Sequence, residues 1–372
     1  MLTVFTLHHH NKNMPSKLHL NHSGSTPSGT ATATNGNARS RMTSGLKRQP
    51  LNGLLAGIIT ALSLAACSAS PNADKPSAGI ASLSTATAPL LPAPAKIPTR
   101  VGKLAVWDTG PVGAKGETIV LWPSILSDHR IYRRQIEAWR GQHRLIVIDG
   151  PGHGQSGPAP GPFSMADCGQ ALTEVLDTLG INTPVVVMGT SWGGLVAGEF
   201  ALAQAKRTRA VVMLNTPVFT APDGPGFSDR FVVWGAKWIH GTQLYRDGVA
   251  RAFFLPATRE NGSLLMDDFH QHLRNADGAA LAQSVRSVLI DREALAPRMR
   301  GIAAPTLFVV GKQDSMYPMD TLREAAATLP KGRFEILDTA HISVVDRPDD
   351  VTKLVDRFVA QIRQSDSHQP AR

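Results

Sequence analysis

The chain has only two cysteines among its 372 residues, Cys67 and Cys168. Two cysteines suggest neither a disulfide framework nor a zinc site. Aromatic residues are also few, at 6%, whereas hydrophobic residues together make up 42%. That hydrophobic fraction is ample for a packed core, and a chain of this length holds either two domains or one large one.

Acidic residues are missing from residues 1–66, which contain six Lys and Arg residues and no Asp or Glu. This segment therefore carries +6 of the formal net charge of +9, and the rest of the chain carries only +3. The total charge thus does not imply a basic patch that binds nucleic acid. We expect no nucleic-acid partner.

A hydrophobic run long enough to span a membrane comfortably is also lacking, because the apolar run Leu51–Ala66 is too short. It follows a short basic stretch and ends in small residues, which is the pattern of a secretory signal peptide. We predict such a signal over residues 42–66, with Met42 as an alternative start to Met1. The polar residues 1–41 show no periodicity and are predicted to be disordered.

The last residues of this signal, Leu64-Ala65-Ala66-Cys67, resemble the lipobox of bacterial lipoproteins. In that family the cysteine is acylated and becomes the mature N-terminus, and Ser68 in the next position is similar to lipoproteins of the outer membrane. The resemblance implies a cell-envelope protein on the periplasmic side, held on a membrane by acyl chains on Cys67. Ordinary cleavage near the same residues and an uncleaved anchor are the alternatives.

The stretch Pro184–Gly194 joins an apolar strand, a very tight turn and the start of a helix. Val185–Met188 is apolar on both faces, as in a buried parallel strand. The turn carries Gly-x-Ser-x-Gly, in which Gly189 and Gly193 leave room for Ser191 in a strained backbone conformation. Its Oγ is then exposed beside free N–H groups of a helix N-terminus. A merely glycine-rich turn is the alternative interpretation.

With this strand, turn and helix the chain resembles the α/β-hydrolase family at its nucleophile elbow. Strands and helices alternate along the chain, which favours an α/β fold with a mainly parallel sheet and helices on both faces. Where strands give way to short helical patterns, the chain looks like members of the family that carry an inserted helical cap. The expected divisions are a Ser/Ala/Pro-rich linker at 67–98, a core at 99–217 and 301–365, the cap at 218–300 and a tail at 366–372.

The segment Gly150–Gly157 contains Gly-x-Gly-x-x-Gly directly after a predicted strand, so a dinucleotide site is one interpretation. That site needs a helix to open at the glycines, but three closely spaced prolines follow and indicate a loop. The segment instead resembles the Gly-His-Gly-x-Ser turn of the α/β-hydrolase family. We expect His153 and Ser156 to be structural there.

Ser191, Asp314 and His341 occur in the order expected of this family, each at the carboxyl end of a predicted strand. The resemblance implies that Ser191 is the nucleophile, that His341 takes its proton and that Asp314 orients the imidazole. Asp320 is better explained as a helix cap, and Asp338 lies on the histidine's own loop. The mechanism requires no metal and no organic cofactor.

In this family one oxyanion-hole donor is the N–H that follows the nucleophile, here Trp192, and the other comes from a loop that carries a His-Gly pair. The corresponding loop of this chain reads Trp122-Pro123-Ser124-Ile125 and departs from that pattern. Pro123 has no N–H to donate. We therefore expect Ser124 to supply the second donor, with Ile125 as the alternative.

An apolar substrate pocket is predicted from four aromatic residues, with packing as the alternative for each: Trp122, Phe219, Trp234 and Trp238. The sequence as a whole predicts a serine hydrolase that cleaves a small carboxylic ester or lactone. C–C bond hydrolases, amidases or aminopeptidases, and cofactor-free haloperoxidases of the family use the same three residues. A catalytically silent surface lipoprotein, which binds a ligand or partner through its cap, is the alternative outside enzymes.

Overall fold

The computed structural model describes residues 89–113, 116–221, 223–261, 263–316 and 318–367. The predicted disordered extension, signal peptide and acylation site at Cys67 lie outside these residues. So do residues 67–88 of the predicted linker and residues 368–372 of the predicted tail.

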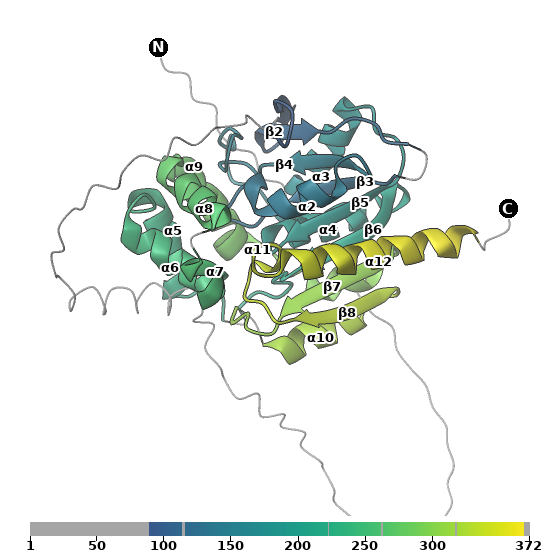
Figure 1. The fold of residues 1–372 in the computed structure, drawn as a ribbon. Helices are drawn as coiled ribbons and strands as arrows, with labels where there is room; N and C mark the ends of the chain where they lie inside the picture. The colour runs from purple at the N-terminus through teal and green to yellow at the C-terminus, as the bar shows by residue number, and fades with distance from the viewer. Residues whose placement is uncertain (1–88, 114–115, 222, 262, 317, 368–372) are drawn as a thin grey trace, which may run out of the picture. The chain divides into compact units, whose positions relative to one another are not determined.

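The described residues form one eight-stranded sheet in the order β1-β2-β4-β3-β5-β6-β7-β8 (Figure 1). The strands are β1 (Ala95–Thr99), β2 (Gly102–Asp108), β3 (Thr118–Trp122), β4 (Arg144–Ile148), β5 (Val185–Thr190), β6 (Thr208–Leu214), β7 (Thr306–Gly311) and β8 (Gly332–Leu337). β2 pairs antiparallel with β1 and β4, and the other pairs are parallel. Every residue of β5 and β7 is buried, as expected for central strands covered on both faces.

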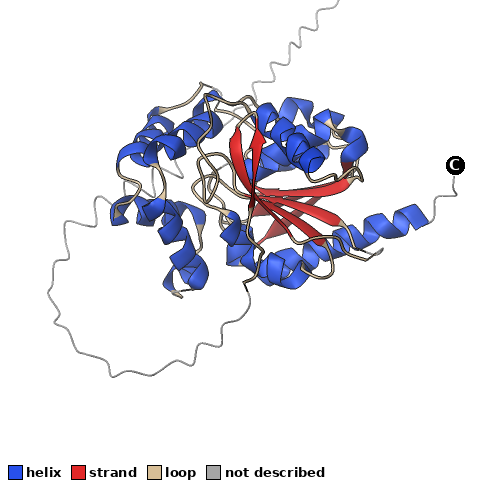
Figure 2. Cartoon of the chain, turned by 90° about the horizontal axis from the view of Figure 1, so that it is seen from above, coloured by secondary structure: helices blue, strands red, loops and turns tan. Residues whose placement is uncertain are grey.

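Helices cover both faces of this sheet (Figure 2), which confirms the predicted α/β fold. They are the 3₁₀ helix η1 (His129–Tyr132) and α2 (Arg133–Trp139), α3 (Met165–Thr178), α4 (Trp192–Ala203), η2 (Ala205–Arg207), η4 (Ala296–Gly301), α10 (Met319–Ala327), α11 (Ser343–Asp346) and α12 (Pro348–Ser367). Ser164 caps α3, since its Oγ accepts the N–H of Asp167 at 3.1 Å. Within the described ranges, no helix has the length and apolarity needed to cross a bilayer.

The first strand corrects the predicted boundary of the folded part. β1 starts at Ala95, inside the range 67–98 that the sequence assigns to the linker. It pairs residue by residue with β2, from Ala95 opposite Val106 to Thr99 opposite Gly102. Pro98 is tolerated because β1 is an edge strand, where one N–H per pair of residues needs no partner within the sheet.

The inserted helical cap lies between β6 and β7, and its helices lie to one side of the sheet in Figure 1. It consists of α5 (Phe227–Trp238), α6 (Gln243–Phe253), α7 (Pro256–Glu260), α8 (Leu264–Asn275), α9 (Gly278–Arg286) and a π-helical turn, η3 (Ser287–Asp291). The two ends of the insertion meet at a narrow neck, because the carbonyl of Val218 accepts the N–H groups of Leu295 (2.9 Å) and Ala296 (3.0 Å). Arg292 also donates to the carbonyl of Phe219.

Candidate active site

Ser191 lies at the turn between β5 and α4, with φ 54° and ψ −109°. Few residues other than glycine adopt a positive φ, so this backbone is strained. The packing around it leaves no room for larger neighbours: a Cβ on Gly189 would lie 1.9 Å from the carbonyl carbon of Gly193, and one on Gly193 would lie 1.9 Å from the carbonyl oxygen of Trp122. The N–H of Ser191 donates to Leu214 at the end of β6 (2.7 Å) and holds the turn against the sheet.

Asp314 and His341 are joined directly. His341 Nδ1 lies 2.8 Å from Asp314 Oδ2, and both side chains are almost fully buried. Burial opposes ionisation of Asp314, but the charge and hydrogen bond of His341, the N–H of Met316 and the amide of Asn215 outweigh it. They hold the pKa of Asp314 below its usual range. The carboxylate is therefore kept charged beside the imidazole.

Asn215, which belongs to none of the sequence motifs, connects the parts of this site. Asn215 directly follows β6 with a positive φ of 48°. Its Nδ2 donates to Asp314 Oδ2 and to the carbonyl of Ala340, both at 3.1 Å. Its position was the available signal: an asparagine, which tolerates positive φ, comes immediately after a strand at the carboxyl edge of a parallel sheet.

The loop of His341 also contacts the cap. The imidazole packs against the ring of Phe253 at the end of α6, with centroids 5.3 Å apart, and the N–H of Ile342 donates to the carbonyl of Phe253 (3.0 Å). Among the described residues, no hydrogen bond joins Ser191 Oγ to His341. In unliganded enzymes such contacts are often long and tighten when substrate binds.

Trp192 and Ser124, the predicted oxyanion donors, are both fully buried. Trp192 is the first residue of α4, so its N–H has no acceptor within the helix. The loop of Ser124 is held in place by His153, whose Nε2 accepts the N–H of Leu126 (2.9 Å), a residue with φ 58°. Burial and the nearby charge of His272 lower the pKa of His153 to about 3, which keeps the imidazole neutral and able to accept.

The four predicted pocket residues do not lie together. Trp122 is fully buried and packs edge-on against Trp192, with centroids 5.7 Å apart, and Phe219 packs partly buried against the core. Trp234 and Trp238 are 48% and 63% exposed on the outside of α5, which corrects their assignment to a substrate pocket. Helical spacing places them on one face of α5 but does not say which way that face points.

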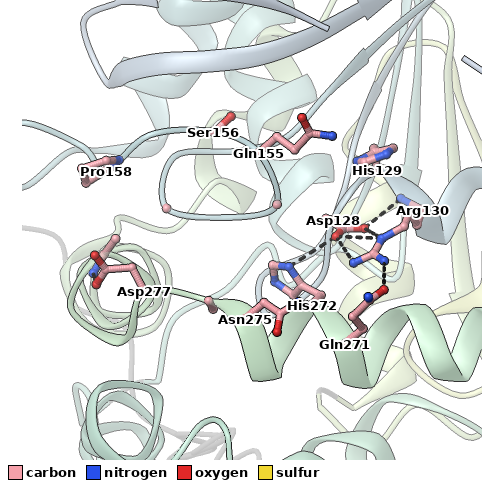
Figure 3. A pocket seen from close by; sticks show the side chains of 14 residues that line it. Asp128, His129, Arg130, Gln155, Ser156, Pro158, Gln271, His272, Asn275 and Asp277 are labelled. Atoms are coloured by element: carbon pink, nitrogen blue, oxygen red, sulfur yellow. Dashed lines mark hydrogen bonds and ion pairs between the residues drawn. The ribbon is translucent and has the colours of Figure 1, made fainter. Parts of the chain in front are cut away.

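A cavity of about 530 Å³ lies between the loop Gly152–Pro158 and helices α8 and α9, and neither Ser191 nor His341 lines it. Figure 3 shows the side chains of Asp128, Arg130 and His272 among those that line it. The carboxylate of Asp128 contacts His272 Nδ1 (3.3 Å) and Arg130 (2.7 Å). Arg130 in turn reaches Asp268 of α8 (3.1 Å). These contacts tie the cap to the core rather than add to the predicted catalytic residues.

Comparison with known proteins adds independent information. Residues 117–348 match the family described as the alpha/beta hydrolase fold. The chain is 25% identical over 280 residues to 3-oxoadipate enol-lactonase 1 of Acinetobacter baylyi, a match that covers 72% of this chain and 97% of that protein. The solved enol-lactonase from Burkholderia xenovorans is similar at a TM-score of 0.63 and 25% identity, covering 69% and 96% of the two chains. A thermophilic esterase from Thermogutta terrifontis shares the fold at a TM-score of 0.65 and 23% identity, covering 72% and 98%.

Proposed function

Because this chain belongs to the alpha/beta hydrolase fold family and is a hydrolase, we propose that it cleaves a carboxylic ester or lactone through a serine acyl-enzyme. The observation that carries the proposal is the buried 2.8 Å contact between His341 and Asp314. These residues follow β8 and β7, and Ser191 stands in its strained turn after β5 at the same edge of the sheet. The likeness to two enol-lactonases supports an ester or lactone as the substrate class.

The proposed mechanism uses the proton positions that these contacts favour. Nδ1–H of His341 donates to Asp314, so Nε2 is left to take the proton of Ser191 as Oγ attacks the carbonyl carbon. Asp314 holds this tautomer and stabilises the imidazolium that forms. His341 then protonates the leaving alcohol, and water attacks the acyl-enzyme in the same way. The proposal involves no metal and no organic cofactor.

The tetrahedral oxyanion is met by the N–H of Trp192 at the start of α4 and by that of Ser124. Each such donor typically contributes about 3 kcal/mol of transition-state stabilisation in enzymes of this type. Support for Ser124 comes from its buried loop. Two residues further along this loop, the N–H of Leu126 donates to His153 Nε2 and holds the backbone in place. The N–H of Ile125 is the alternative donor.

We expect Ser191→Ala to abolish labelling of the protein by a fluorophosphonate probe, because the probe reacts only with an activated serine Oγ. Ser365→Ala, which removes an exposed serine on α12, is the matched control and should label like the unaltered protein. Undiminished labelling of Ser191→Ala would contradict the assignment. A panel of nitrophenyl esters, lactones, amides and vinylogous diketones, read for burst acylation, then separates ester hydrolysis from the other reactions of this family and from a silent binding protein.

We also propose that the protein is anchored in the cell envelope through an acylated Cys67. The support is the sequence Leu64-Ala65-Ala66-Cys67 at the end of the predicted signal peptide. Mass spectrometry of the protein from purified membranes should find an acylated Cys67 at the N-terminus. A soluble periplasmic product that lacks Cys67 would rule out the anchor.

A further inference from the structure

Helix α5 of the cap presents a row of aromatic side chains outward. We call Phe227, Phe231, Trp234 and Trp238 the α5 aromatic face, because their spacing of four, three and four residues places them on one side of the helix. Phe227, Trp234 and Trp238 are 77%, 48% and 63% exposed. The ring of Phe231 stacks with those of Phe227 and Trp234, at centroid distances of 6.3 and 5.6 Å.

Phe227, Trp234 and Trp238 are not needed to seat α5 in the cap, whereas Phe231 is partly buried against the core. The opposite side of α5 is formed by Val232, Gly235 and Ala236, all buried. Gly235 allows close packing, since a Cβ there would lie 2.5 Å from the ring of Tyr245. A contiguous exposed aromatic surface on a helix that is already packed marks an interaction site.

The exposed charged residues of α5 beside this face are both basic. Arg230 and Lys237 are exposed beside the aromatic rings, and Lys237 Nζ lies 4.9 Å from the ring centroid of Trp238. The acidic residue of α5, Asp229, is turned to the helix N-terminus, where its carboxylate accepts the N–H of Gly226 (2.8 Å). Aromatic rings flanked by Lys and Arg match the boundary between lipid headgroups and acyl chains in anionic membranes.

We propose that the α5 aromatic face docks on the surface of a lipid bilayer that contains anionic lipids, with α5 lying in the plane of the interface. Phe227 and Trp238 enter the headgroup region, and Arg230 and Lys237 contact the lipid phosphates. A second copy of the chain fits this face less well, because a symmetric dimer would bring the same cations of both copies together. The contact goes beyond the proposed function and needs no acylation of Cys67.

The test uses the full chain with Cys67→Ser, which removes the predicted acylation site. We expect it to float with vesicles of phosphatidylglycerol and phosphatidylethanolamine, and to float much less with phosphatidylcholine alone. Phe227→Ser with Trp238→Ser should weaken this binding about tenfold or more, since two aromatic side chains lose their burial in lipid. Arg230→Glu with Lys237→Glu should weaken binding to the anionic vesicles selectively. Ile336→Ser, which removes an exposed apolar side chain on β8, is the matched control and should bind normally.

Tryptophan fluorescence locates the contact directly. Of the six tryptophans, four are at most 3% exposed: Trp107, Trp122, Trp139 and Trp192. Brominated lipids should therefore quench only Trp234 and Trp238, and Trp234→Phe with Trp238→Phe should still float but lose the quenching. Thermal unfolding checks that each variant is folded. Unchanged flotation of Phe227→Ser with Trp238→Ser, quenching that persists without Trp234 and Trp238, or a dimer that these serine substitutions dissociate would each overturn the proposal.

Discussion

Two residues with positive φ lie next to each other where β5 and β6 end, Ser191 with φ 54° and Asn215 with φ 48°. The N–H of Ser191 donates to Leu214, and the side chain of the next residue, Asn215, donates to Asp314. A single short connection thus relates the position of the proposed nucleophile to that of the proposed acid. The backbone strain at Ser191 persists only because the surrounding structure enforces it.

Asn215→Ala tests that connection at the residue scale. The substitution removes a hydrogen bond to the charged Asp314 and another to the carbonyl of Ala340. A hydrogen bond to a charged group contributes about 1.5–3 kcal/mol, so we expect kcat/KM for a nitrophenyl ester to fall about 10- to 100-fold. Asn275→Ala, which truncates an exposed amide on α8, should have no such effect. An Asn215→Ala enzyme with unaltered kcat/KM would show that Asp314 is positioned without it.

At the scale of elements, α8 is the helix of the cap that the core holds by charge. Its Asp268 accepts from Arg130 of η1 (3.1 Å) and from Arg133 of α2 (2.9 Å). The carboxylate is 12% exposed and the two arginines are 24% and 29% exposed. Partly buried pairs in a shared network contribute more than isolated surface pairs. The seating of the cap on the core thus depends on a few charges.

Asp268→Asn should loosen α8 from the core. We expect the free energy of unfolding to fall by about 1–2 kcal/mol and amide hydrogen exchange in α8 to accelerate, because two arginines lose their common partner. The control is Asp177→Asn, which breaks the pair with Arg207 at 2.6 Å. There the carboxylate is 58% exposed, so the loss should not exceed about 0.5 kcal/mol. Equal exchange rates in α8 of both variants would argue against this role of Asp268.

The sequence predicts those elements whose signal is local, and it misses those that depend on contacts with distant residues. β5 is predictable because it is apolar on both faces and bounded by a turn motif, and α3 is predictable from its cap and its apolar stripe. β1 is not, because Ala95–Thr99 has the composition of a linker and becomes a strand only by pairing with β2. The outward direction of the α5 aromatic face is also hidden, since periodicity shows which residues share a face and not what covers it. Asn215 acts through residues about 100 positions away, a relation that a single sequence does not contain.

At the scale of the whole molecule, buried ionisable groups set the response to pH. The folded state lowers the pKa of His153 to about 3, chiefly through burial, against an ordinary value of 6.5. As pH falls below 6.5, the unfolded chain takes up a proton at this position and the folded chain does not. Stability contributed by the neutral imidazole is therefore lost between pH 6.5 and about pH 3. Asp128, which faces His153 along with His272, has a strongly lowered pKa and loses its contribution only at still more acidic pH, below the ordinary value of 3.8.

We therefore expect the free energy of unfolding to decrease by about 2–3 kcal/mol between pH 6.5 and pH 4.5 on account of His153, at about 1.4 kcal/mol per pH unit. Urea unfolding at a series of pH values measures this slope. His153→Gln should be less stable at pH 7 but flatter across this range, because its side chain does not titrate. Asn275→Gln, which changes an exposed side chain on α8 that does not titrate, should keep the slope of the unaltered protein. If His153→Gln keeps it too, other groups determine the pH response.

The neck of the cap has a consequence for how this protein can be altered. The two ends of the insertion are hydrogen-bonded to each other, because the carbonyl of Val218 accepts the N–H groups of Leu295 and Ala296. Ends this close can be joined to a foreign segment without pulling β6 and β7 apart, since loop closure costs little when the ends already lie together. The cap can therefore be replaced as one unit between these two points. Grafting a cap from a relative onto the same two points would exchange the surface offered to substrates and membranes while β5, β7 and β8 stay as they are. The new cap would also have to supply the contacts that Phe253 makes with His341 and with the N–H of Ile342.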